Sequence, residues 1–159
     1  EMRGTLSIAS TVAFFAARLC MSSGFCAGQM KETSAPYYAG GPPILIGSWH
    51  GSRWIQRAAQ EFDGWVASGR HTGAPTLAEG IRRFRDLGGK RAVVTNITVD
   101  LHEPDTEQEP NRYDLRCTPA TAHERLAHLA ALGYDDVVLV CRTPTEDHLA
   151  AIRALWPVG

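Results

Sequence analysis

Short apolar segments alternate with amphipathic segments four times between residue 42 and the C-terminus, and this alternation narrows the folds that the chain can adopt. The short segments are rich in Ile, Val and Leu and occupy residues 44–46, 65–67, 92–101 and 136–141. Runs of this length and composition are typical of strands that are buried on both faces. Such strands pair in parallel when amphipathic helices connect them, because the helices cover the faces of the sheet. The sequence therefore predicts an α/β fold of four strand–helix units.

Caps, prolines and glycines indicate where each helix of these units begins and ends. Thr76 and Glu79 have the spacing of a capping box, in which each side chain bonds a free N–H group of the first turn. A proline after a threonine marks a first helical position, and a glycine in the left-handed conformation ends a helix. The last helix is expected to bury Leu149, Ile152 and Leu155. The predicted helices begin at Ser52, Thr76, Thr118 and Thr143, and they end at Asp63-Gly64, Gly88-Gly89, Gly133 and Pro157.

Residues 1–41 are predicted to form a separate segment, a helix followed by a loop. No charge occurs from residue 5 to residue 17, and the apolar residues at 8, 12, 15 and 19 recur on one face of a helix. A secretory signal or a membrane anchor is the alternative, because a basic residue precedes this stretch and small residues follow it. Arg18, however, would interrupt a membrane span. Because the first residue is Glu rather than Met, we expect a fragment, a processed product or a non-native start.

The charge balance and the cysteines exclude several classes of partner. The chain has 16 basic and 17 acidic residues and a net charge of -1, so neither nucleic acid nor a membrane surface is expected as a partner. The cysteines form no Cys-x-x-Cys pair and show no zinc-ligand spacing, and we therefore predict no metal site. Free thiols indicate a reducing, cytoplasmic compartment, with a disulfide framework as the alternative. The four cysteines are Cys20, Cys26, Cys117 and Cys141.

Two groups of phrases resemble the luciferase-like monooxygenase family, which includes bacterial luciferase and the deazaflavin-dependent oxidoreductases. The first group is PPILIGSW at residues 42–49 with DGWVAS at residues 63–68. The second group is DLRC at 114–117, ERLAHL at 124–129 and GYDDVVLV at 133–140. The resemblance implies that residues 42–159 are the C-terminal half of a (β/α)8 TIM barrel, strands five to eight. Periodicity alone also allows a small doubly wound sheet.

The same resemblance implies an oxidoreductase or monooxygenase that acts on a small-molecule substrate with flavin mononucleotide (FMN) or the deazaflavin coenzyme F-420. The first four strands of the family, which form much of the flavin pocket and the substrate cleft, have no counterpart here. No catalytic residue is therefore assigned, and the chain alone could be inactive. The alternative is a non-catalytic half-barrel that binds cofactor phosphate or only self-associates. In either case open strand edges favour a homo-oligomer or pairing with a missing N-terminal half.

The turn between the first predicted strand and its helix is the candidate cofactor site. Its glycines allow the backbone to approach a ligand closely, its serines donate hydrogen bonds, and the N–H groups at the start of a helix favour an anion. These properties also fit a plain turn that Ser52 caps. The resemblance implies that the turn holds the cofactor phosphate, although Ser48-Trp49 stand where the family has a second glycine. The candidate residues are Gly47, Ser48, Trp49, His50, Gly51, Ser52 and Arg53.

Other polar residues are weaker candidates, each with a structural alternative. His71 could move a proton or lie in a surface loop. Either Thr95 or Asn96 could point into the barrel, and the alternative is a hydrogen-bonded position in the core. Arg116 could reach an anionic tail. The acidic residues between 103 and 109 are expected to lie in a solvated loop, and Asp135-Asp136 in a turn or helix end.

Overall fold

The computed structural model describes residues 7–8, 42–142 and 144–155 of the chain. Within these ranges six strands form one sheet, four α-helices accompany them, and the 3-10 turn η1 (Gly69–His71) follows β3. The strands are β1 (Ser7–Ile8), β2 (Leu45–Gly47), β3 (Gly64–Ser68), β4 (Ala92–Asp100), β5 (Leu115–Arg116) and β6 (Asp136–Cys141). The helices are α1 (Trp54–Gln60), α2 (Ala74–Asp86), α3 (Pro119–Leu132) and α4 (Glu146–Ala154).

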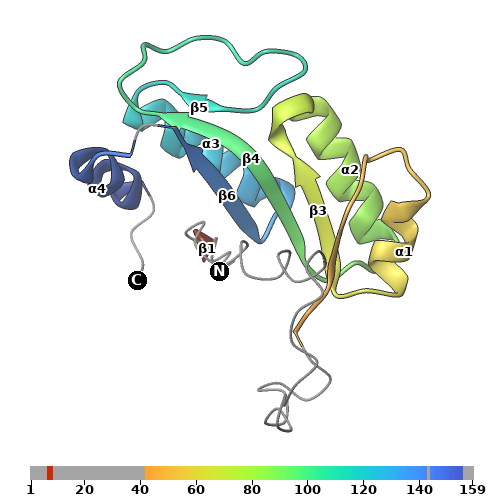
Figure 1. The fold of residues 1–159 in the computed structure, drawn as a ribbon. Coiled ribbons are helices and arrows are strands. Elements are labelled where there is room, and N and C mark those ends of the chain that lie inside the picture. Colours follow the sequence, from red (N-terminus) through yellow and green to blue (C-terminus); the bar gives the residue numbers. More distant parts are fainter. Residues whose placement is uncertain (1–6, 9–41, 143, 156–159) are drawn as a thin grey trace, which may run out of the picture.

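All strand pairs in the described sheet are parallel, and the sheet runs in the order β1-β6-β4-β3-β2 (Figure 1). The short strand β5 pairs with the end of β4 outside this row. Strands β2, β3, β4 and β6 therefore lie side by side in the order in which they occur in the sequence. The α/β class and the parallel sheet predicted from the alternation are confirmed.

The helices α1, α2 and α3 lie in one layer, because α1 packs against α2 and α2 packs against α3. Crossovers between parallel strands are right-handed, so strands that are added in one direction place their helices on the same face of the sheet. Burial along β4 agrees with this arrangement. Ile97 and Val99 are buried toward the helices, whereas Asn96 and Thr98 on the opposite face are not.

The core lies between this helix layer and the sheet. The indole of Trp65 on β3 is 1% exposed, and its centroid lies 5.8 Å from the ring of Phe84 and 6.2 Å from that of Tyr134. Aromatic pairs at these distances add to the free energy gained from burial alone. The helices contribute Ile55, Leu77, Ile81, Leu126, Leu129 and Ile152, and the strands contribute Val94, Ile97, Val99, Leu115 and Val137.

Several boundaries are those that the sequence predicts. Strand β6 begins and ends at the predicted residues, and α3 begins at Pro119 with Thr118 as its N-cap. The left-handed φ angles of Gly88 (84°) and Gly133 (102°) end α2 and α3. Glycine adopts this conformation without the steric conflict that a Cβ atom introduces.

The predicted start of α2 was wrong. The helix begins at Ala74 with Gly73 as its N-cap, so Thr76 lies inside the first turn and does not cap it. Pro75 indicates the observed start of the helix. Proline is favoured in the first turn, where the N–H groups have no partner within the helix. Gly73 packs against the carbonyl group of Pro110, where any side chain would collide with it.

The predicted inner face of α4 was wrong in part. Thr145 caps this helix through a hydrogen bond from the N–H of His148 to Oγ1, whereas the predicted cap Thr143 lies outside the described residues. The helix therefore starts later than expected. Residues at positions i, i+4 and i+7 share one face of a helix, and residues 148, 152 and 155 have this spacing. Ile152 and Leu155 are buried as predicted, but Leu149 is 40% exposed and His148 is 4% exposed.

The N-terminal helix prediction was wrong at the two residues that can be compared. Ser7–Ile8 forms a strand that pairs with Asp136 and Val137 of β6, whose edge offers free N–H and C=O groups. The remainder of residues 1–41, including Cys20 and Cys26, lies outside the described ranges.

Cys117 and Cys141 are free thiols, and burial raises the pKa of Cys117.

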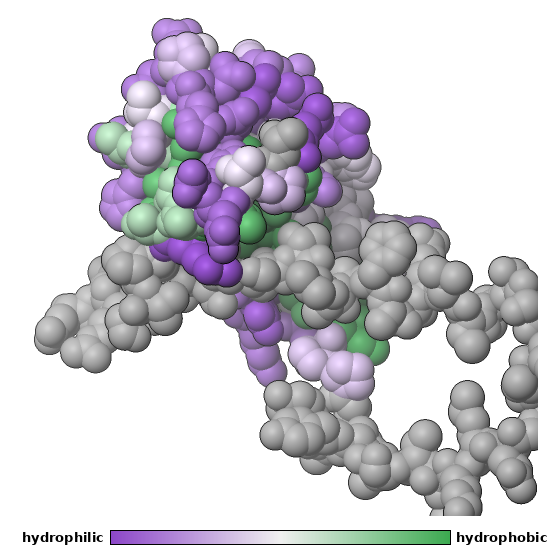
Figure 2. Space-filling model, turned by 60° about the vertical axis from the view of Figure 1, so that its left-hand side comes forward, coloured by the Kyte–Doolittle hydropathy of each residue, from purple (hydrophilic) through white to green (hydrophobic). Residues whose placement is uncertain are grey.

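The polar loop between β4 and β5 is exposed over most of its length, as expected for its acidic residues. It lies at the top of the molecule in Figure 1, and Figure 2 shows that the upper part of the forward face is mainly hydrophilic. Of the described helices, none has the length and apolar content needed to cross a membrane.

Candidate functional site

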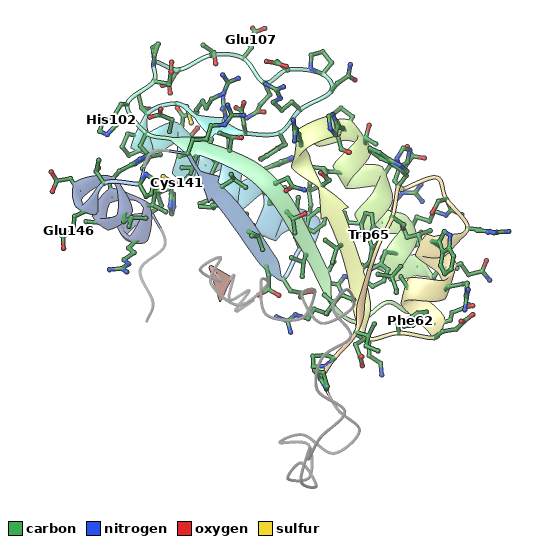
Figure 3. All side chains as sticks on the ribbon, viewed as in Figure 1. Phe62, Trp65, His102, Glu107, Cys141 and Glu146 are labelled. Atoms are coloured by element: carbon green, nitrogen blue, oxygen red, sulfur yellow. The ribbon has the colours of Figure 1, made fainter. Side chains whose placement is uncertain are left out.

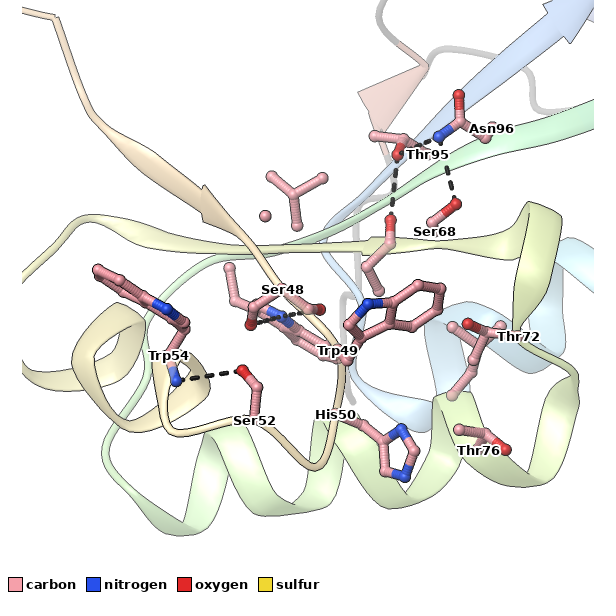
Figure 4. Close-up of a pocket in the computed structure, with 15 residues that line it drawn as sticks. Ser48, Trp49, His50, Ser52, Trp54, Ser68, Thr72, Thr76, Thr95 and Asn96 are labelled. Carbon is pink, nitrogen blue, oxygen red and sulfur yellow. Dashed lines mark hydrogen bonds between the residues drawn. The ribbon is translucent and has the colours of Figure 1, made fainter.

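A cavity of about 430 Å³ opens at the carboxyl ends of β2 and β3, beside the middle of β4 (Figure 4). The turn after β2 forms one wall, and the end of β3, the middle of β4 and the start of α2 form the others. Ligands of parallel α/β proteins bind at this end of the strands, because the loops that lead into the helices converge there. The polar residues that line the cavity are Ser48, His50, Ser52, Ser68, Thr72, Thr76, Thr95 and Asn96.

Most of the predicted cofactor-binding turn contributes to this cavity. Five of its seven residues line the wall, whereas Gly51 and Arg53 do not. Arg53 is exposed at the N-terminal end of α1. The residues of the turn that line the cavity are Gly47, Ser48, Trp49, His50 and Ser52.

Ser52 forms two hydrogen bonds that connect the turn to the helix that follows it. Its Oγ accepts a hydrogen bond from the N–H of Trp54 at 3.1 Å, and its own N–H donates to the carbonyl oxygen of Trp49 at 3.0 Å. The second bond closes a four-residue turn from Trp49 to Ser52. The N-cap of α1 is Arg53, which forms no capping bond through its side chain, so Ser52 bonds the helix from the position before the cap. The N–H of Trp54 is therefore not free for an anion.

Three backbone donors of the turn remain without a partner. The hydrogen bonds among the described residues do not engage the N–H groups of Trp49, His50 and Gly51. These donors are consecutive in a turn that is exposed or half-buried. Consecutive N–H groups in a turn can bind an anion together.

Helix α2 holds the turn from below. The guanidinium of Arg83 donates to the carbonyl oxygen of His50 at 2.8 Å. Gly80 allows the close approach, because a Cβ atom there would lie 2.6 Å from Cη2 of Trp65 and 3.0 Å from Cβ of His50. Both contacts fix the backbone of the turn, and neither engages the N–H groups of Trp49, His50 and Gly51.

His50 is the only titratable side chain among the described residues that line the cavity. Its Nε2 lies 3.8 Å from a carboxylate oxygen of Glu79 on α2, and its ring is one-third exposed. Its Nδ1 is buried and has no hydrogen-bond partner in the described part of the chain. Figure 4 shows the ring between the turn and α2.

Thr95 and Asn96 occupy an irregularity in β4, where the pairing with β6 shifts between Val94 and Ile97. Thr95 Oγ1 donates to the carbonyl oxygen of Ala67 at 3.1 Å, and Asn96 Nδ2 donates to Ser68 Oγ at 3.2 Å. Asn96 has a φ angle of 60°, which side chains other than Gly, Asn and Asp rarely adopt. Both residues line the cavity, so neither is a core position.

The remaining candidates have mainly structural contacts. His71 lies exposed in η1 and does not line the cavity. Asp135 accepts from Arg85 and from the N–H of Ala92, both within 2.8 Å, and this ties α2 to β4. Arg116 bonds Asp114 at 2.8 Å, and this pair raises the pKa of the guanidinium.

The sequence did not indicate a Cys–His contact at the end of β6. Cys141 Sγ lies 3.5 Å from Nδ1 of the buried His148, and the ring of His102 lies 5.2 Å from that of His148. Figure 3 shows Cys141 and His102 close to α4. The seven-residue separation of Cys141 and His148 fits no ligand or catalytic spacing, so only the fold brings them together.

The side chains of the described cavity wall offer little acid or base chemistry, because they include a single histidine. Within the described ranges no three His, Cys, Asp or Glu side chains are grouped so that they could hold a metal ion.

No protein-family model and no curated protein sequence matches the chain.

Proposed function

We propose that the chain is the C-terminal half of a luciferase-like flavin or deazaflavin oxidoreductase, and that its β2–α1 turn binds the cofactor phosphate. The observation that carries the proposal is the set of three unengaged N–H groups at Trp49, His50 and Gly51, beside a cavity at the carboxyl ends of the strands. A phosphate presents several acceptor oxygens and can satisfy all three donors together.

The strand order supports a half-barrel over a doubly wound sheet. In a doubly wound sheet the order of strands reverses once and helices cover both faces. Strands β2, β3, β4 and β6 instead advance in one direction, with their connecting helices in one layer. Strand β1 pairs in parallel with β6, as the first and last strands of a barrel do.

The cavity suits a ligand that joins an anionic group to an aromatic ring. Trp49 lines it and is 58% exposed, so its indole is available for stacking. Trp54 also lines it, but the guanidinium of Arg57 covers one face of its ring at 4.6 Å from the centroid. Arg83 brings a positive charge to the back of the turn through its bond to the His50 carbonyl. A flavin or deazaflavin would supply the redox chemistry, and the residues of this chain would bind and orient its phosphate end.

Fluorescence titration tests the proposal with FMN and riboflavin, which differ by the phosphate. We expect FMN to bind at least about tenfold more tightly, because charge-assisted hydrogen bonds are each worth roughly 1.5–3 kcal/mol. Equal binding of the two compounds, or no binding of either up to millimolar concentration, would contradict a phosphate site. The deazaflavin coenzyme titrated in parallel identifies the preferred cofactor.

Two substitutions of His50 distinguish the contribution of its backbone N–H group to FMN binding from that of its side chain. His50→Ala removes the imidazole and keeps the N–H group. His50→Pro also removes the N–H group, at the second residue of the turn, where proline is well tolerated. FMN affinity should fall about tenfold further in His50→Pro than in His50→Ala, whereas riboflavin affinity should not separate the two variants.

A non-catalytic half-barrel that self-associates is the second candidate. Strand β2 lies at the edge of the described sheet and pairs only with β3, and Ile44 just before it is 55% exposed. Unpaired edges with exposed apolar residues favour pairing with another chain. Sedimentation that shows a dimer, combined with no binding of FMN or the deazaflavin, would favour this candidate.

A further inference from the structure

A second hollow, of about 390 Å³, lies over the carboxyl half of β4, on the face of the sheet opposite α1, α2 and α3. Asn96, Thr98 and Asp100 follow one another at every second position of β4 and all line it. Both faces of a parallel sheet are usually apolar. A polar row on a central strand therefore indicates contact with water or with a polar ligand.

Two arginines that form no ion pair within the described part of the chain line the same hollow. Arg70 lies in η1 after β3, and Arg142 follows β6, so they approach from the strands on either side of β4. Both are exposed, and neither forms an ion pair with the residues that the structure describes. Two cations at one concave site favour binding of an anion between them.

Among the other charged groups that line the hollow, Arg116 and Asp114 bond each other, and Arg112 lies 3.7 Å from Glu109. Arg116 bonds Asp114 at 2.8 Å and lies 3.6 Å from Glu109. Asp100 accepts a hydrogen bond from the N–H of His102 at 3.1 Å. The carboxylates of Asp100 and Glu103 line the wall as well, and they would repel a ligand with several negative charges.

We propose that this hollow binds a small organic molecule with one oxyanion group and one or more hydroxyl groups. The guanidinium groups of Arg70 and Arg142 hold the oxyanion, since their planar donors match carboxylate and phosphate oxygens. Asp100 and Thr98 accept hydrogen bonds from the hydroxyl groups. This assignment does not depend on the cofactor proposal, because the two cavities share only Asn96.

Ligand-observed NMR with two matched pairs of probes tests the site. Lactate is compared with the neutral lactamide, and glycerol phosphate with glycerol. At least one acid should bind about tenfold more tightly than its neutral partner, and the acid that does so identifies a carboxylate or a phosphate as the recognised group. If neither acid binds more tightly than its neutral partner, the proposal is overturned.

Substitutions then locate the binding. Arg70→Gln and Arg142→Gln should each weaken binding of the acid about tenfold, and the double variant should abolish it. Lys90→Gln removes the same charge at the opposite end of β4 and should leave the affinity unchanged. Both arginines are exposed, so thermal unfolding should match that of the unmodified chain. Loss of binding in Lys90→Gln, or full binding in the double variant, overturns the assignment.

The same variants separate this site from the cofactor site. FMN titration of Arg70→Gln and Arg142→Gln should match that of the unmodified chain if the phosphate binds at the β2–α1 turn. His50→Pro should leave lactate and glycerol phosphate binding unchanged. Either proposal can therefore fail while the other holds.

Discussion

The indole Nε1–H of Trp65 donates to both the carbonyl oxygen and the hydroxyl of Ser48, each at 3.1 Å. Trp65 is packed in the core between the sheet and α2, and Ser48 belongs to the candidate phosphate turn. The relationship ties the position of the turn to the packing of the core. A change in either should therefore alter the other.

Removing the donor of this hydrogen bond and removing one of its acceptors should lower the free energy of unfolding by different amounts. Trp65→Phe deletes the N–H group and part of a buried ring, and we expect it to lower the free energy of unfolding by about 2 kcal/mol. Ser48→Ala leaves the carbonyl acceptor in place and should cost less than about 1 kcal/mol. Urea unfolding measures both values. Equal losses in the two variants would show that the hydroxyl, rather than the buried indole, fixes the turn.

Gly80 should resist replacement although it lies in the middle of a helix. An alanine normally stabilises a helix relative to glycine by about 1 kcal/mol. Here its Cβ atom would press on Trp65 and His50, so Gly80→Ala should instead destabilise the protein by about 1–3 kcal/mol. Glu79→Ala, at the exposed neighbouring position, is the matched control and should change stability by less than about 0.5 kcal/mol. If the Gly80→Ala variant were more stable than the unmodified chain, the turn would pack less closely against α2 than the structure shows.

Asn96 offers a direct test of the irregular backbone in β4. Its φ angle of 60° suits glycine better than alanine. Asn96→Gly and Asn96→Ala both remove the bond to Ser68, so their difference in stability reports the backbone alone. We expect Asn96→Ala to be less stable than Asn96→Gly by about 1 kcal/mol in thermal unfolding. The opposite order, which strand propensity favours, would place this residue in regular strand geometry.

Two buried tyrosines should make the protein sensitive to alkali. Burial raises the pKa of Tyr113 and Tyr134 above the ordinary value of about 10. The neutral form is thus favoured in the folded state, and its stabilisation is complete below about pH 10 and lost as the pH rises toward the folded-state pKa. Urea unfolding at pH 8 and pH 11 should show this loss.

Tyr134→Phe separates the hydrogen bond of this residue from its titration. The variant loses the bond from Oη to the carbonyl oxygen of Leu77, so its stability at pH 8 should fall by about 1 kcal/mol. Its decline between pH 8 and pH 11 should be smaller than that of the unmodified chain. An unchanged decline would mean that other groups cause the alkaline loss.

The sequence predicted those parts of the fold that local chemistry determines. The apolar run from Asp136 to Cys141 and the glycine stop at Gly133 appear as expected, because neither depends on distant residues. The start of α2 was missed because the capping-box spacing of Thr76 and Glu79 was followed in place of Pro75, which indicates the first turn. The contact of Gly73 with Pro110, which is distant in the chain, could not be predicted from the sequence. The burial of His148 was missed because a histidine does not stand out in an apolar pattern, although it has the i, i+4, i+7 spacing with Ile152 and Leu155.

The candidate site was predicted only in part, because local sequence determines some of its residues and the fold brings in the others. The turn after β2 was recognisable from its glycines and serines, and five of its residues line the cavity. Thr72 and Thr76 also line it, although they are distant in sequence, because α2 crosses beside β3. Arg70 and Arg142 were not singled out, since only the strand order brings the ends of β3 and β6 to either side of β4.

Amide chemical shifts of the turn test the central claim most directly. In a ¹H–¹⁵N spectrum of the labelled chain, added FMN should shift the backbone amides of Trp49, His50 and Gly51 downfield, while riboflavin at the same concentration should shift them much less. Shifts of equal size with both compounds, or shifts confined to residues outside the turn, would contradict phosphate binding by these N–H groups.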